Sequence, residues 1–439
     1  MSAPLPKIAI QKAHRTVLAR QPEGVIPWPM EPGSANPELQ ALALKSKKRP
    51  KVRFPKRPVV FVSDAHADAN AFVDSLIAAG TVNCDKKGRL KLTRAGRRQE
   101  IIIGGDCLDK GPSNLSLLRE IGQLYRQKAR ITLLAGNHDL RLLMGLLSRK
   151  QKTSVGSQHL FVRMGKKVIP LFREVFDQYL AGKDWDKKVP SEAKCRAALF
   201  PSEEWFDEFE FFAAGHLTVE GIEREVGKMR SKVDKFERHC HDHGMTLRQV
   251  YAAARQCERL FLHKKGEFRW FYERMELMAK RGSFLFLHAG LDDDMARLVY
   301  KKGINHANKA FHRSLRYQDL FSFYYSPLAN TFRTKYRPAD LPLTNLGVRW
   351  MRKAGIQVLV QGHVSRSHGQ RLAVKHGVLH IEADITLDCN SRALEGLEGR
   401  GMGATVIAAK RGVLGLSCDY PQAKWLSPKH LKQICGALA

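Results

Sequence analysis

Short apolar runs that end in clusters of polar residues recur along this chain, and this pattern limits the fold more than any other feature. The runs are rich in β-branched and aromatic residues, and they lie at 58–63, 100–104, 130–135, 283–287, 357–360 and 377–381. Each is too short for a helix and apolar on both faces, which is typical of a strand buried between two layers. The sequence therefore predicts a sheet covered on both sides.

Helical patterns separate the early runs. Residues 69–79 and 114–127 have the apolar spacing of amphipathic helices, and each lies between two predicted strands. Alternation of strand, polar loop and helix is characteristic of an α/β fold. Two further runs, at 403–409 and 413–418, are separated by a short polar turn and predict a β-hairpin.

The polar residues that follow five of the predicted strands carry most of the functional information. They are Asp64 and His66, Asp106 and Asp109, Asn137 and His138, His288, and His363. In open α/β sheets, the carboxyl ends of the strands form the crevice in which ligands bind. We therefore expect these side chains to gather at one site, because packing alone does not call for polar residues at five strand ends.

Such a set of side chains fits a metal centre. Mixed nitrogen and oxygen ligands suit manganese, iron or zinc better than calcium. The carboxylate of Asp106 has two oxygens and can bridge two ions, and two ions about 3.5–4 Å apart can activate a water and hold a phosphoryl group. His138 directly follows a candidate ligand and is free to protonate a leaving oxygen, with Asp109 or Asp139 to orient its ring.

The order of these motifs resembles the calcineurin-like metallophosphoesterases. The blocks are D-x-H at 64–66, G-D-x-x-D at 105–109, G-N-H-D at 136–139, H-A-G at 288–290 and G-H at 362–363. The second block, with Gly111-Pro112 after it, is similar to the bacterial phosphoprotein phosphatases and symmetrical diadenosine tetraphosphatases. The resemblance covers residues 58–145 and 283–410 and implies a four-layer α/β/β/α sandwich of two mixed sheets with an inserted helical subdomain.

The resemblance also implies a role for each residue. It implies two divalent metal ions, with manganese expected and iron or zinc as alternatives. The first ion would be held by Asp64, His66 and Asp106, and the second by Asp106, Asn137, His288 and His363. His138 would be the general acid, with Asp109 as its partner.

Several positions depart from the family pattern. Many members have a second histidine after the last G-H, where this chain has Ser365, but the phosphatase branch lacks that histidine too. The branch usually has arginine where Lys110 stands, and lysine binds phosphate as a point charge rather than through two parallel hydrogen bonds. The resemblance also implies a second phosphate-binding arginine between the last two histidine ligands, and we expect this to be Arg333, with Arg337 as the alternative.

The charge of the chain indicates an anionic partner. Lys and Arg number 74 against 43 Asp and Glu, which gives a net charge of +31. Residues 1–57 contain many prolines and twelve basic side chains, eight of them in Lys45–Arg57. Such a run binds phosphate backbones or anionic lipid, but it is equally typical of a solvated tail. A phosphorylated substrate is thus expected, and the arm could contact nucleic acid.

Five segments are predicted in all. They are a basic arm (1–57), the first part of a metallophosphoesterase domain (58–181), a helical insertion (182–282), the second part of the domain (283–420) and a tail (421–439). Within the insertion, helices are predicted at 218–240, from Thr246 onward and at 268–278, the first two as an antiparallel hairpin. No run of the sequence is apolar enough to span a membrane.

The sequence thus predicts a dinuclear phosphatase that hydrolyses phosphomonoesters or phosphoanhydrides by in-line attack of a metal-bridging hydroxide. One alternative is a metal-dependent phosphodiesterase or nuclease, and another is a polyanion-binding relative without activity. The eight cysteines form no CxxC pair or regular framework, which is typical of reduced thiols and predicts a cytoplasmic protein.

Overall fold

A computed structural model describes residues 25–28, 52–85, 89–151, 154–317, 319–420 and 422–438. The chain divides into two compact units. The first comprises residues 1–137, 275–312 and 326–439, and the second comprises residues 138–274 and 313–325. Each unit is described separately below.

The first unit is built on two mixed sheets. In the part of it that the structure describes, an eight-stranded sheet has the order β1 (Val25–Pro27), β15 (Ala423–Leu426), β14 (Gly412–Ser417), β13 (Gly403–Ala408), β2 (Val59–Val62), β5 (Glu100–Ile103), β6 (Ile131–Leu134), β7 (Met275–Glu276). A five-stranded sheet has the order β11 (Arg371–Lys375), β12 (Val378–Glu382), β10 (Val358–Gln361), β9 (Phe284–Leu287), β8 (Met278–Arg281). A separate ribbon pairs β3 (Val82–Cys84) with β4 (Leu90–Leu92).

The two sheets pack face to face around one apolar core. Phe61 and Ile102 of the larger sheet lie in the same buried cluster as Phe286 and Val360 of the smaller one. The rings of Phe61 and Phe286 lie 5.8 Å apart between centroids. Burying each such side chain contributes roughly 1.5–3 kcal/mol, so this interface stabilises the unit strongly.

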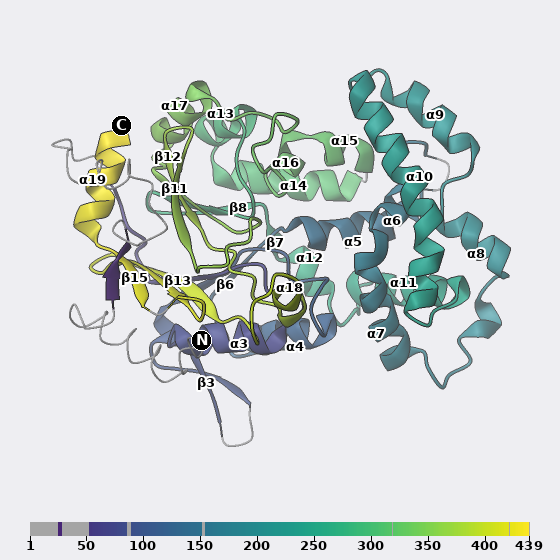
Figure 1. Cartoon of the computed structure of the whole chain (residues 1–439), viewed down its shortest axis with the longest axis horizontal. Helices are drawn as coiled ribbons and strands as arrows, with labels where there is room; N and C mark the ends of the chain where they lie inside the picture. The colour runs from purple at the N-terminus through teal and green to yellow at the C-terminus, as the bar shows by residue number, and fades with distance from the viewer. Residues whose placement is uncertain are drawn as a thin grey trace. The chain divides into compact units, whose positions relative to one another are not determined.

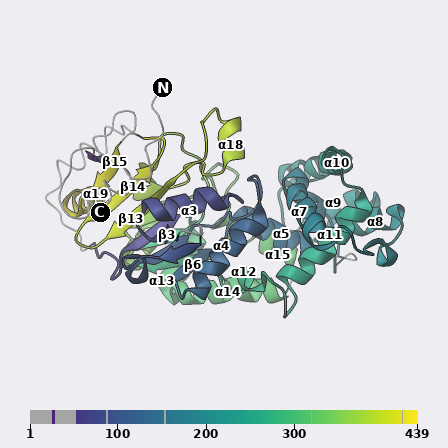
Figure 2. The ribbon, with the colours of Figure 1, turned by 90° about the horizontal axis from the view of Figure 1, so that it is seen from below.

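Helices cover the outer faces of both sheets, as Figures 1 and 2 show. α3 (Ala69–Ala78) and α4 (Asn114–Arg126) pack together on the larger sheet, and their N-termini are capped by Asp68 and Ser113. Beyond the smaller sheet, α13 (Asp293–Lys302) packs on α17 (Asn345–Lys353) (Figure 1). The remaining helices that begin in this unit are η2 (Gly96–Arg98), α14 (Ile304–Tyr317), α16 (Pro327–Asn330), α18 (Cys389–Leu394) and α19 (Pro428–Leu438).

Helices make up the regular structure of the second unit, and no strand occurs among its described residues. Its helices are α5 (Asn137–Ser148), α6 (Leu160–Arg163), η3 (Gly165–Val168), α7 (Ile169–Tyr179), η4 (Asp186–Lys188), α8 (Glu192–Leu199), α9 (Glu204–Ala213), α10 (Val219–Asp242), α11 (Leu247–Phe261), α12 (Arg269–Glu273) and α15 (Leu320–Tyr325). Thr218 and Thr246 cap α10 and α11, because each side chain accepts a hydrogen bond from a backbone N–H in the first turn.

The predicted strands and the predicted sandwich are confirmed, and so are helices α3, α4, α10 and α11. The predicted helix over 268–278 is wrong beyond Glu273. There Met275 and Glu276 pair with β6, and β8 forms a hairpin with β9. Strand pairing with distant residues thus overrides the local helical pattern. The predicted hairpin is also not the main packing, because α11 packs chiefly on α7.

Part of the predicted arm belongs to the fold. Strand β1 pairs in parallel with β15, and Trp28 is fully buried in the core between the sheets. Most of the predicted arm, including Lys45–Lys51 of its basic run, lies outside the described residues. The boundaries predicted at residues 57, 181, 282 and 420 stay predictions. Among the helices that the structure describes, none is long and apolar enough to cross a bilayer.

Candidate metal centre

The strand ends predicted to carry function meet where the two sheets face each other. β2, β5 and β6 run parallel and in register, so Asp64, Asp106 and Asn137 follow them at one edge of the larger sheet. β9 and β10 are also parallel, and they carry His288 and His363 at their carboxyl ends. The order of the strands therefore brings residues from five distant parts of the sequence together.

The backbone around these residues adopts conformations that L-amino acids disfavour. The φ angle is 55° at Asp64, 40° at His66, 52° at Asp106, 71° at Asp109 and 69° at His363. Each such residue costs of order 1–3 kcal/mol, and clusters of them are characteristic of functional sites. Backbone hydrogen bonds stabilise the turns, for the Asp64 and His66 N–H groups donate to the carbonyls of Gly105 and Asp106, at 3.1 and 3.0 Å.

Backbone carbonyls orient three imidazole rings. Nδ1 of His66 lies 3.1 Å from the Leu108 carbonyl, and Nδ1 of His288 lies 2.8 Å from the Gly104 carbonyl. Nε2 of His363 lies 3.1 Å from the carbonyl oxygen of Arg333. A carbonyl only accepts, so we assign the ring proton to the nitrogen facing it. In His66 and His288 the other nitrogen, Nε2, is directed toward Asp106, an arrangement common in metal sites.

Asp64 is held through one of its two oxygens. Its Oδ2 accepts hydrogen bonds from the Ser63 hydroxyl and from the backbone N–H of His363, the latter at 3.0 Å. Its Oδ1 lies 4.0 Å from Nε2 of His66. One carboxylate oxygen thus fixes the side chain, and the other faces the candidate ligands.

Asp106 lies at the middle of the cluster. Its Oδ2 is 3.8 Å from Nε2 of His66 and 3.5 Å from Nε2 of His288. Asn137 Oδ1 is 3.1 Å from that same nitrogen of His288.

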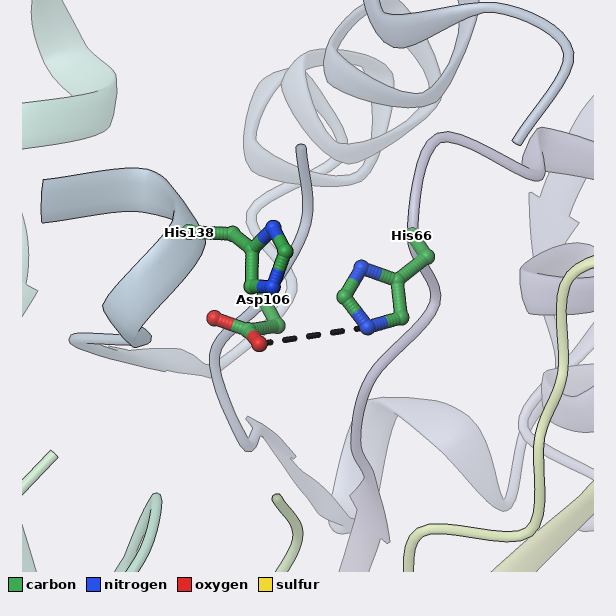
Figure 3. A group of neighbouring side chains, drawn as sticks. All are labelled: His66, Asp106 and His138. Carbon is green, nitrogen blue, oxygen red and sulfur yellow. Dashed lines mark ion pairs between the residues drawn. The ribbon is translucent and has the colours of Figure 1, made fainter. Parts of the chain in front are cut away.

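Two groups of candidate ligand atoms, each within 4.8 Å of one another, share Asp106. One is His66, Asp106 and His138, and the other is Asp106, His288 and His363. Figure 3 shows the first group, with His66 from the loop after β2 and His138 from the start of α5 both directed toward Asp106. His138 therefore lies close enough to the predicted ligands to act beside them.

The electrostatics of the cluster favour a bound cation. Burial raises the pKa of Asp64 to about 6, with Asp106 adding to this and His288 opposing it. Burial lowers the pKa of His66 and of His363 to about 3, so both rings are neutral at pH 7. Burial also disfavours the His288 cation, but Asp106 and Asp64 raise its pKa to about 10. The buried carboxylates thus draw positive charge to the site.

The donor set fits the predicted metals. Carboxylate and amide oxygens with neutral imidazole nitrogens suit a divalent ion of intermediate softness. Asp64, Asp106 and His288 are all nearly or fully buried, and buried carboxylates are normally paired or bound to metal. The residues present therefore fit a bound divalent cation.

The predicted residues outside the ligand set differ in how they contact the cluster. Lys110 Nζ lies 2.7 Å from Nε2 of His66, which places its ammonium in the cluster. Arg333 reaches the site through its backbone carbonyl. Asp109 is buried, and its backbone N–H donates to Asn114 Oδ1 at 2.8 Å. The roles of Lys110 and Arg333 in phosphate binding, and of Asp109 beside His138, stay predictions.

Sequence reasoning missed Asp384. This buried carboxyl accepts a hydrogen bond of 3.3 Å from Ser365, the residue that stands where many family members have histidine. Burial and the charge of Asp64 raise the pKa of Asp384 well above its usual value. A signal was present, because Asp384 follows β12 as the predicted ligands follow their strands.

Comparison with known families decides the assignment. The profile of the calcineurin-like phosphoesterases matches residues 57–367, which is most of the chain. The chain belongs to this family. It is a metal-dependent phosphoesterase, and the resemblance inferred from the five motifs is confirmed. None of the curated proteins compared with the chain matches its sequence.

Among solved structures, this phosphoesterase is similar to several phosphatases. A cold-active protein tyrosine phosphatase has 13% identity and a TM-score of 0.44, with 89% of this chain and 84% of that chain covered. The cold-active enzyme of a psychrophilic Shewanella species has 13% identity, a TM-score of 0.43 and coverage of 88% and 85%. A protein serine/threonine phosphatase from Saccharomyces cerevisiae has 9% identity, a TM-score of 0.38 and coverage of 94% and 90%.

Proposed function

We propose that this phosphoesterase is a dinuclear phosphatase that hydrolyses phosphomonoesters or phosphoanhydrides. The observation that carries the proposal is the position of Asp106, which both groups of candidate ligand atoms share. A carboxylate in that position can hold two ions at once, the arrangement that clamps a phosphoryl group for in-line displacement.

The chain would hold the two ions through two ligand sets that share Asp106. Asp64, His66 and Asp106 would bind the first, and Asp106, Asn137, His288 and His363 the second. Two divalent cations, manganese first among them, would lower the pKa of a water and neutralise charge on the phosphoryl oxygens. The carbonyl partners of the three imidazoles would fix the orientation of the rings when the ions bind.

The chain's own residues would complete the reaction. His138 would donate a proton to the leaving oxygen, and Asp109 would orient the imidazole. Lys110 would bind the substrate phosphate, and its ammonium already lies among the candidate ligands. Arg333 would supply a second, bidentate contact to the phosphate, the geometry that a guanidinium favours.

The test is hydrolysis of p-nitrophenyl phosphate with Mn²⁺ present. We expect Asp64→Asn to abolish turnover, since it removes one ligand charge. His138→Ala should reduce kcat by roughly 10²–10⁴-fold, because proton donation is lost. Asp294→Asn and His241→Ala are matched controls on exposed helical positions and should leave turnover unchanged. Undiminished activity in either site variant would sink the assignment.

A substrate panel separates phosphatase from phosphodiesterase activity. We expect faster hydrolysis of a phosphomonoester or diadenosine tetraphosphate than of bis(p-nitrophenyl) phosphate or a single-stranded oligonucleotide. The reverse order would favour the predicted alternative of a nuclease.

We also propose that the enzyme works in the cytoplasm. None of the eight cysteines forms a disulfide in the structure, and five of them are buried. Unpaired thiols are typical of reducing compartments.

A further inference from the structure

A cavity within the second unit is lined by cationic side chains. It has a volume of about 210 Å³, and its polar lining includes Arg141 from α5, Lys166 and Lys167 from η3, and Lys232, Lys235 and His239 from α10. The three residues from α10 are spaced so that they share one face of that helix. The described residues that line the cavity include no Asp or Glu.

Lys232 is the least exposed of the lysines around the cavity. Its ammonium donates a hydrogen bond to the backbone carbonyl of Arg163, and it lies so close to Gly165 that a Cβ there would be 3.1 Å from Nζ. The carbonyl is a neutral acceptor, so this hydrogen bond does not offset the positive charge, while the Arg163 side chain pairs with Glu225. Burial lowers the pKa of Lys232 to about 7, and the nearby Arg141, Arg163, Lys167 and Lys228 add to this effect. The fold thus holds an ammonium where other cations repel it.

A second cavity, in the first unit, has a lining of mixed charge. That cavity contains Arg297 and Asp294, whose side chains pair at 3.1 Å. Like charges gathered in a partly buried place destabilise the fold unless an anion offsets them. The high net charge of the chain therefore explains exposed lysines, but it does not explain a cavity with a cationic lining and a partly buried ammonium.

We propose that this cavity binds a phosphate-type oxyanion, either free or as the phosphoryl group of a small molecule. The volume would hold roughly seven waters, which suits one phosphate group with a short substituent. Lysine ammoniums bind phosphate as point charges, and the Arg141 guanidinium can bind two of its oxygens. Because a nucleic-acid strand is normally bound along an extended groove, a cavity of this size favours a small anion.

The test is calorimetric titration of inorganic phosphate, sulfate and phenyl phosphate at low ionic strength. The full chain carries Asp106→Asn, so that the candidate metal centre is disabled in every sample. One double variant in this background carries Lys166→Ala and Lys235→Ala, two exposed residues of the cavity lining. The control double variant carries Lys264→Ala and Lys265→Ala, two exposed residues in the turn that follows α11. Circular dichroism checks that every variant is folded.

We expect the cavity pair to weaken binding of all three anions by about ten-fold or more, and the control pair by less than about two-fold. Tighter binding of phenyl phosphate than of phosphate would identify a ligand with a substituent, and equal binding would identify the free anion. The proposal would be overturned if the two double variants bound the anions with equal affinity, or if the Asp106→Asn chain bound no anion. So would an oligonucleotide that displaces phosphate at lower concentrations than sulfate does. Failure of the phosphatase proposal would leave this result unchanged.

Discussion

The candidate metal centre and the cationic cavity gather side chains of opposite charge, and they do so by different means. In the metal centre, the buried carboxylates of Asp64 and Asp106 face the neutral imidazole of His66, and the site attracts cations. In the cavity, arginine and lysine side chains from three helical segments surround a partly buried ammonium, and the site attracts anions. Each cluster destabilises the fold unless an ion of opposite charge is bound, so the sign of the excess charge predicts the sign of that ion.

The two clusters also differ in how the sequence encodes them. The metal ligands follow parallel strands, so a regular local pattern reveals them and the sheet places them together. The cavity joins Arg141, Lys166 and Lys232, which lie on helical segments that only tertiary packing brings close. Sequence patterns therefore predict the first site and not the second.

Lys110 tests the difference between the two sites most directly, because it is a cation inside the metal centre. We expect Lys110→Ala to raise KM for p-nitrophenyl phosphate by about ten-fold or more, with a smaller change in kcat, since a charge-assisted contact to substrate is lost. Lys110→Arg should recover most of the affinity. Steady-state kinetics measure both parameters, with Lys91→Ala, an exposed position on β4, as the control. An unchanged KM would show that Lys110 does not bind the substrate.

Lys232 permits a finer comparison, through the pH dependence of stability. Its pKa falls from the usual 10.5 to about 7 in the folded chain. The cost of burying the charged amine is fully present below pH 7 and disappears as the pH approaches 10.5, so the wild type should gain stability over Lys232→Met as the pH rises. We expect a gain of about 1 kcal/mol between pH 7 and pH 9, allowing for solvent screening.

Thermal unfolding in phosphate-free buffer measures this gain. The cations that act most on Lys232 are Arg141, Arg163, Lys167 and Lys228, and Arg163 is itself paired with the carboxylate of Glu225. Lys235→Met, on the exposed part of the same helix face, is the matched control and should show a constant difference from the wild type. If the difference in stability between the wild type and Lys232→Met did not vary with pH, the inference that burial disfavours the Lys232 cation would be wrong.

Most of the sandwich could be predicted because its strands are short, apolar and separated by clear turns. The errors lie where distant residues decide the structure. The segment 275–281 forms strands because β6 and β9 offer partners, and Val25–Pro27 forms one because β15 does. A local pattern contains no information on such partners, so propensity alone misassigned these segments.

Most of the candidate site could be predicted for the same reason, but the groups that orient it could not. The carbonyls of Gly104, Leu108 and Arg333 fix the imidazoles, and any residue type supplies a carbonyl. Asp384 was missed although it also follows a strand, because its partner Ser365 comes from a different loop. A residue that acts through its backbone, or through a side-chain contact that only the folded chain brings about, cannot be recognised from the sequence pattern.

The central claim is that Asp106 serves two metal ions at once, and metal content tests it most directly. The wild type and Asp106→Asn are purified after growth with added Mn²⁺, and bound metal per chain is measured by inductively coupled plasma mass spectrometry, with Asp294→Asn as the control. The account predicts about two ions per chain in the wild type and the control, and fewer than about one in Asp106→Asn. Two ions retained in Asp106→Asn, or no more than one in the wild type, would contradict it.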